Sequence, residues 1–108
     1  MPVKSETQQA LAALHRLRST WLATRTARIN TVRGLLREFG VVIPTGARHV
    51  VPALGAVLDD ADAGVPSLLR PALAEAAREL REIEGRIRTV EHQLDAVAEQ
   101  VVSRLVWK

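Results

Sequence analysis

The side chains that stand out chemically in this sequence are arginines, spaced along the first forty residues. Arg18 and Arg25 fall on the same helical column as the apolar residues Leu11, Val32 and Phe39. A charge on an otherwise apolar stripe costs stability unless it is paired or useful. Two interpretations stay open: the guanidinium groups pair with acids of the second half or keep their heads in water, or they contact phosphate or a partner domain. The candidate nucleic-acid contacts are Arg18, Arg25, Arg28, Arg33 and Arg37.

A second polar strip lies on one flank of the same predicted helix. Thr26, Asn30, Arg33 and Arg37 follow one another at spacings of four, three and four. Arginine, threonine and asparagine are residues that commonly contact backbone phosphates, but a solvated helix face explains the strip equally well. Because no aromatic residues interleave these basic ones, recognition of single strands by stacking is not expected.

The sequence shows no arrangement typical of a metal or catalytic site. The histidines lie far apart and outside any H-E-x-x-H motif; they are His15, His49 and His92. Asp60 and Asp62, with Gly64, resemble a calcium loop only faintly. The glycine stands at a ligand position, and Pro71 stands where such a loop needs glutamate. Phosphate-binding glycine loops and nucleophile elbows are absent. We therefore expect no catalytic residue, metal or cofactor in this chain, and no enzymatic activity of its own.

Composition narrows the fold class. The chain has 108 residues, of which 47% are hydrophobic and only 3% aromatic, so it is about one small domain and not an all-β fold. No apolar run approaches the roughly 18 residues of a membrane span, and Met1–Ala10 lacks the apolar core of a signal peptide. The absence of cysteine suits a cytoplasmic protein. We expect no membrane contact.

The charge is unevenly distributed. Residues 1–50 hold eight Lys/Arg against two acids, whereas residues 51–108 hold seven against ten. The basic first half can face a polyanion, or it can face the acidic second half of its own chain.

The spacing predicts one long basic helix over residues 1–40. Apolar residues recur at helical spacing from Leu11 to Phe39, Ser5 is a candidate N-cap, and Gly40 follows the last periodic residue. Residues 41–66 form a connector punctuated by proline and glycine. Within the connector, residues 47–58 can hold a short helix.

Residues 67–108 carry the clearest pattern, a heptad repeat. Apolar residues follow alternating steps of four and three, which is typical of a coiled coil. Ser67 is a candidate cap, and Pro71 is tolerated in a first helical turn. The expected fold is all-α: two long helices in an antiparallel coiled-coil hairpin, with a short connecting helix. The predicted seam is Leu69, Leu73, Ala76, Leu80, Ile83, Ile87, Val90, Leu94, Val97 and Val101.

Several runs resemble a known family. They are the run from Ala13 to Arg18, Arg25-Thr26, Asn30, Arg33-Gly34-Leu35-Leu36, Glu38-Phe39-Gly40, Ile43-Pro44 and Gly46. Together they resemble the middle of bacterial transposases of the insertion-sequence one-ten family, which combine a RuvC-like domain with a C-terminal serine domain. Pro2-Val3-Lys4-Ser5 with Gln8-Gln9 resembles the stretch after the last catalytic aspartate, and Leu68-Leu69 with the heptad helix resembles the coiled-coil domain. The resemblance covers roughly residues 2–100.

The resemblance implies a DNA transposase and recombinase for the full-length family. Such proteins use four acids with magnesium, a nucleophilic serine and a guide RNA. None of the four acids, and no serine domain, has a counterpart here. We therefore expect an interior fragment of a mobile-element protein, in which residues 1–40 lead from the RuvC-like domain into the coiled coil.

Three functions remain open at this point. The first is a transposase fragment without catalytic residues that retains a dimerising region near DNA and guide RNA. The second is an autonomous coiled-coil protein that regulates a full-length transposase by pairing with it. The third is a freestanding nucleic-acid-binding protein that uses the first helix. The first two imply self-association or pairing with a full-length transposase.

Overall fold

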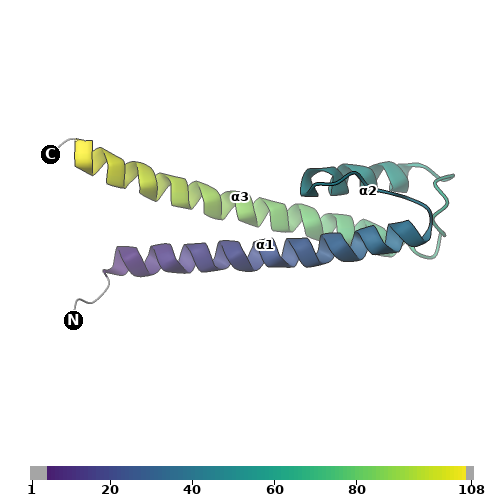
Figure 1. Cartoon of the computed structure of the whole chain (residues 1–108), viewed down its shortest axis with the longest axis horizontal. Helices are drawn as coiled ribbons and strands as arrows, with labels where there is room; N and C mark the ends of the chain where they lie inside the picture. The colour runs from purple at the N-terminus through teal and green to yellow at the C-terminus, as the bar shows by residue number, and fades with distance from the viewer. Residues whose placement is uncertain (1–4, 107–108) are drawn as a thin grey trace.

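The computed structural model describes residues 5–106, with side chains up to residue 104, and this part of the chain is helical with no strand. Its elements are α1 (Glu6–Glu38), a short 3-10 helix η1 (Ala47–His49), α2 (Val50–Asp59) and α3 (Arg70–Val106). The all-α prediction is confirmed. The long helices α1 and α3 lie side by side and run in opposite directions, and α2 lies over one end of them (Figure 1). No helix in the described part is both long enough and apolar enough to cross a membrane.

Both ends of α1 follow from local chemistry. The Ser5 hydroxyl accepts from the Gln8 backbone N–H, and the Gln8 side chain accepts from the Ser5 N–H, which is a capping box. At the other end, Gly40 adopts φ +81°. There the N–H of Gly40 donates to Arg37, and the N–H of Val41 donates to Leu36. This is a Schellman motif, so the predicted start and stop of the first helix are confirmed.

The connector doubles back before α2 begins. In Figure 1 the chain leaves the end of α1 and runs back along the two long helices before it forms α2. The helix α2 then points toward the end of the molecule at which α1 stops and α3 starts, which we call the closed end. Pro52 is the third residue of α2, where its missing N–H is not needed by the helix. The helix α3 begins at Arg70, not at the predicted Ser67. The difference arises because Ser67 lies in a turn, where its carbonyl accepts from the Arg70 N–H.

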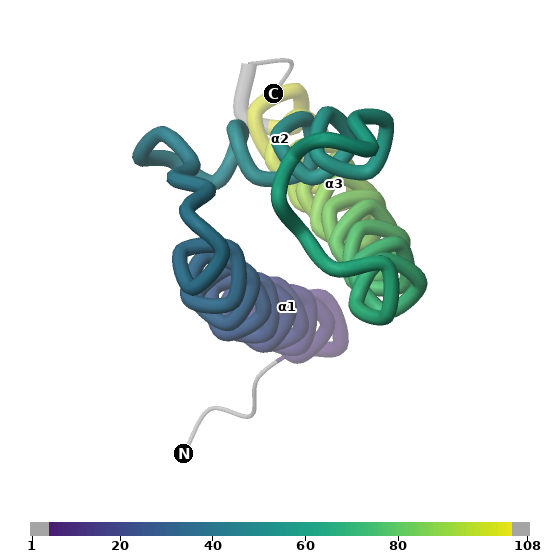
Figure 2. The backbone as a smooth tube through the Cα atoms, turned by 90° about the vertical axis from the view of Figure 1, so that its right-hand side faces the viewer, coloured from purple at the N-terminus to yellow at the C-terminus, as the bar shows by residue number. Residues whose placement is uncertain are grey.

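The core lies at the closed end, where three helices meet. Figure 2, which looks toward this end, shows α2 beside α3 and the connector rising from α1. Side chains from every element except η1 are buried there together. Burial of apolar surface stabilises folds by roughly 25 cal/mol per Å², so most of the stability is expected to come from this end. The buried cluster is Ile29, Val32, Leu36, Ile43, Val50, Leu54, Val57, Val65, Leu73, Ala77 and Leu80.

The predicted seam on α3 is buried along only part of its length. Its residues from Leu73 to Val90 are buried with one exception, whereas Leu94 and Val97 are half-buried and Val101 is 46% exposed. The exception is Ala76, which is half-buried, while its neighbour Ala77 is buried. The cause is α2, which packs on α3 near the closed end and shifts the buried face of α3 by one residue. Because α1 and α3 alone enclose the far half, burial decreases toward the open end.

Candidate functional site

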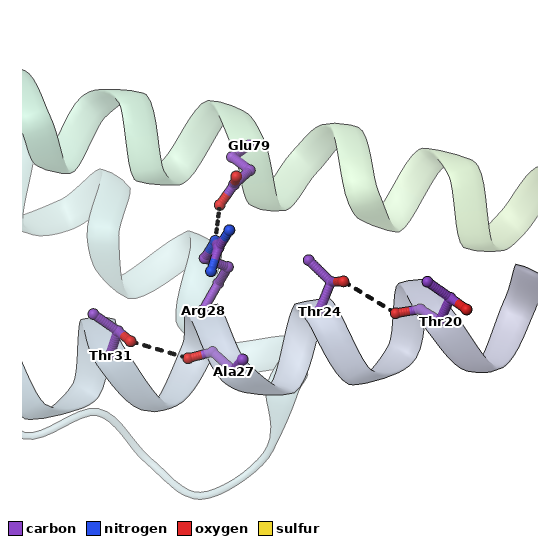
Figure 3. A network of polar contacts seen from close by, with 6 residues as sticks. All are labelled: Thr20, Thr24, Ala27, Arg28, Thr31 and Glu79. Carbon is purple, nitrogen blue, oxygen red and sulfur yellow. Dashed lines mark hydrogen bonds and ion pairs between the residues drawn. The ribbon is translucent and has the colours of Figure 1, made fainter.

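Two of the candidate arginines join α1 to α3 by ion pairs. Arg18 Nη2 lies 3.0 Å from Glu91 Oε2, and Arg28 Nε lies 2.7 Å from Glu79 Oε1. Figure 3 shows Arg28 reaching from α1 to the carboxylate of Glu79. Arg28 follows Arg18 along α1, whereas Glu79 precedes Glu91 along α3, as two helices of opposite direction require. For these two arginines the structure therefore shows pairing with acids of the second half.

Threonines along α1 bond to their own helix. The hydroxyls of Thr24 and Thr31 donate to the carbonyl oxygens of Thr20 and Ala27, one turn earlier (Figure 3). Such bonds satisfy the hydroxyl locally. The polar contacts between α1 and other elements come from its arginines and not from these threonines.

Arg33 holds the connector. Its Nη1 donates to the carbonyl oxygen of Ile43 at 2.8 Å, and its Nη2 donates to those of Pro44 and Gly46 at 2.8 and 3.1 Å. A planar guanidinium presents several donors in a fixed fork, so one side chain fixes the chain reversal between α1 and η1. Arg33 was predicted as a nucleic-acid contact, and the structure shows its donors turned to the backbone instead.

A second arginine, Arg70, holds the other end of α2 and was not singled out from the sequence. Its Nη1 donates to the carbonyl oxygens of Val57 and Leu58, in the last turn of α2. Its Nε and Nη2 donate to Val65 and Asp60. These bonds satisfy carbonyls that a helix end leaves without partners, and a cation is favoured there by the helix dipole. The sequence offered one signal for Arg70, which is its position shortly after the Asp- and Gly-rich turn of residues 59–66.

Arg25 differs from the other candidates. Its side chain is half-buried, and its Nε is buried with no hydrogen-bond partner. A buried donor without a partner costs about 1–3 kcal/mol. Arg25 lies on the wall of an open pocket of ≈ 530 Å³, between α1, the start of α2 and the middle of α3. The pocket is also lined by Arg48, Arg81 and Arg88. The structure thus brings Arg25 together with three arginines that the sequence did not single out.

The remaining polar residues of the predicted strip lie on the surface. Thr26, Asn30 and Arg37 are exposed. Of the second predicted strip, only Arg33 turns inward. In the structure the strip is an exposed helix face, from which the side chain of Arg33 turns to the connector.

The described residues do not assemble a metal site. No three histidine or carboxylate side chains among them lie close enough together to hold an ion. Asp60, considered above as part of a calcium loop, instead accepts the Asp62 N–H at 2.9 Å through its side chain, which is an Asx-turn.

Comparison with known proteins gives three related sequences. A protein of Pseudomonas aeruginosa named as a family 20 transposase is 40% identical over 97 residues, which is 89% of this chain and 29% of the relative. The transposase for insertion sequence element IS1111A of Coxiella burnetii is 33% identical over 95 residues, 88% of this chain and 26% of the relative. The y4pF/y4sB transposase of Sinorhizobium fredii is 31% identical over 94 residues, 87% of this chain and 24% of the relative.

The chain is thus related in sequence to insertion-sequence transposases over most of its own length. It spans only between 24% and 29% of the length of these relatives. No family model matches the chain, and no solved structure matches it.

Proposed function

We propose that this chain is a piece of an insertion-sequence transposase of the one-ten family, and that it takes part in DNA transposition and recombination as a helical scaffold. The observation that carries the proposal is the similarity to three transposases over nearly nine-tenths of the chain. The family assignment rests in addition on the runs between Ala13 and Gly46. The catalytic acids, the magnesium and the nucleophilic serine of the family belong, in this proposal, to other parts of a longer protein.

The scaffold consists of α1 and α3 packed as an antiparallel coiled coil. Three observations support this packing: the opposite directions of the helices, the burial of α3 side chains from Leu73 to Val90, and the Arg18–Glu91 and Arg28–Glu79 pairs. The proposed units are a basic helix over residues 1–40, a connector over 41–66 and a heptad helix over 67–108. The partners are DNA and a guide RNA in the bacterial cytoplasm, and a second copy or a full-length transposase.

A segment exchange tests the proposal. The 97 matching residues of the Pseudomonas aeruginosa relative are replaced by those of this chain, and excision and insertion of a marked element are measured in cells. The unmodified relative is the positive control. We expect the chimera to transpose, and to lose transposition when it carries Ile87→Asp, because Ile87 is only 4% exposed. A chimera that is well expressed and folded but inactive contradicts the proposal.

A second candidate is a separate pairing protein that regulates a full-length transposase. It is favoured by apolar side chains on the open half of the hairpin: Leu17, Val101 and Val102 are 45%, 46% and 57% exposed. Exposed apolar surface of this kind can serve association. Co-expression of the 108-residue chain with the intact relative distinguishes the candidates. Regulation predicts co-purification and fewer transposition events, whereas an unchanged frequency and no co-purification contradict it.

A further inference from the structure

The pocket beside Arg25 concentrates positive charge from three elements that are far apart in sequence. Arg25 comes from α1, Arg48 from η1, and Arg81 and Arg88 from α3. The four arginine residues line one space of ≈ 530 Å³. Like charges brought together in this way repel one another, so the arrangement is better satisfied when an anion lies between them.

Two carboxylates also line the pocket, and they do not balance the arginines. Glu91 is engaged by Arg18 from outside the pocket, through Nε and Nη2 at 3.1 and 3.0 Å. Glu84 is the other acid on the wall. The pocket therefore keeps an excess of positive charge.

Arg25 lines the pocket, and its Nε is buried beneath the wall with no hydrogen-bond partner in the protein. Val51 and Pro52, also on the wall, belong to the first turn of α2, which has no side-chain cap. The dipole of α2 is positive at this end. Surplus arginines are matched best by an oxyanion with several acceptor oxygens, and phosphate has the geometry that arginine forks recognise.

We propose that this pocket binds a phosphate group, held by Arg25, Arg48, Arg81 and Arg88. The source of that phosphate, a backbone phosphate of nucleic acid, rests on the function proposed above. The pocket itself does not, because its positive charge is a property of these residues alone. Phosphate contacts of this kind fix the position of a nucleic acid without reading its sequence.

The test uses the 108-residue chain and two exposed arginines on the pocket wall. The variant R81A/R88A removes two of the four guanidinium groups. The variant R16A/R86A is its matched control, because it removes the same charge from two exposed arginines that do not line this pocket. All of these side chains are exposed, so both variants are expected to stay folded, which circular dichroism checks. A further variant, Arg25→Gln, removes the guanidinium of the orphaned donor.

Binding is measured with a labelled DNA duplex and an RNA hairpin over a salt series, and with inorganic phosphate by calorimetry. We expect R81A/R88A to weaken binding of each nucleic acid about tenfold or more. The slope of log affinity against log salt is expected to become shallower by about two. Inorganic phosphate should bind the wild-type chain and be lost in R81A/R88A and Arg25→Gln. The control is expected to keep its affinity within about twofold, because exposed charges away from the contact are screened.

The outcomes separate this inference from the proposed function. Equal losses in R81A/R88A and R16A/R86A overturn the pocket in favour of diffuse charge. Wild-type binding of inorganic phosphate without binding of nucleic acid supports the pocket and overturns the nucleic-acid source. A wild-type chain that binds neither overturns the whole inference, while the segment exchange still decides the proposed function independently.

Discussion

Arg18 on α1 donates both its Nε–H and an Nη2–H to the same oxygen, Oε2 of Glu91 on α3, across 73 residues of sequence. The two side chains are 37% and 41% exposed. The bond therefore lies at the edge of the helix interface. It joins α1 to α3 in the part of the molecule that α2 does not cover.

The Arg18–Glu91 pair should contribute little to stability despite its good geometry. A double-mutant cycle with Arg18→Ala, Glu91→Ala and both together is expected to give a coupling of about 0.5–1 kcal/mol, because half-exposed pairs are screened by water. Urea unfolding followed by far-UV circular dichroism gives the four free energies. A coupling indistinguishable from zero would mean that the bond does not form in solution. One well above this range would mean a drier interface than the exposures indicate.

A single substitution at Ile87 on α3 is predicted to destabilise the packing of α3 against α1. Ile87→Asp replaces an apolar side chain that is 4% exposed by a carboxylate, and we expect a loss of about 3–5 kcal/mol. The matched control is Arg86→Asp, one residue earlier on the exposed side of α3, with an expected change of about 0.5 kcal/mol. Thermal melts compare the two variants. Equal melting midpoints would show that α3 does not bury this face.

Arg33 should be needed for stability rather than for nucleic-acid binding. Arg33→Ala leaves three connector carbonyls without their donor, and we expect a loss of about 2–3 kcal/mol. Amide hydrogens of the connector and η1 should exchange faster. The control Arg37→Ala removes an exposed arginine one turn later, in the last turn of α1, and is expected to cost about 0.5 kcal/mol. The prediction fails if Arg33→Ala keeps its stability while losing affinity for DNA.

Two glycines of the first half should respond to alanine with opposite signs. Gly40 has φ +81°, and an added Cβ would meet nothing within 4 Å, so Gly40→Ala is expected to cost about 1–2 kcal/mol from backbone conformation alone. Gly34 lies inside α1 in equally open space. Gly34→Ala is therefore expected to stabilise the chain by about 0.5–1 kcal/mol. Urea midpoints that move in the same direction for both would contradict this account of how α1 ends.

The elements and their ends could be predicted where the cause is local. The capping box at Ser5 and the Schellman motif at Gly40 depend on residues within one turn of each other, which a sequence displays directly. The start of α3 was misplaced because Ser67 is a good cap by type. Whether Ser67 caps α3 or lies in the turn before it depends instead on Arg70 and on the chain reversal. The burial of Ala77 in place of the predicted Ala76 has a similar cause. The heptad pattern describes the packing of two helices, whereas α2 is a third helix that packs on α3.

The roles of the arginines could not be read from their spacing. The helical column holds Arg18 and Arg25, and Arg33 lies on the flanking strip, but the partners of Arg18 and Arg33 come from α3 and the connector. Arg18 finds a carboxylate, Arg33 finds carbonyl oxygens, and Arg25 keeps a donor without a partner. Arg48, Arg81 and Arg88 gain interest only once the fold brings them to Arg25. Distant pairing of this kind is a property of tertiary structure.

The opposite directions of α1 and α3 bring the first turn of one and the last turn of the other to the same end of the molecule (Figure 1). In a segment with this shape the chain enters and leaves at the same end, so the segment projects from its attachment as an arm. A larger protein can carry such an arm without separating the parts to which it is attached. The overall extent of the molecule is 63 Å. In such a protein the length of the arm would set the distance between the attachment and the closed end, where the three-helix core lies.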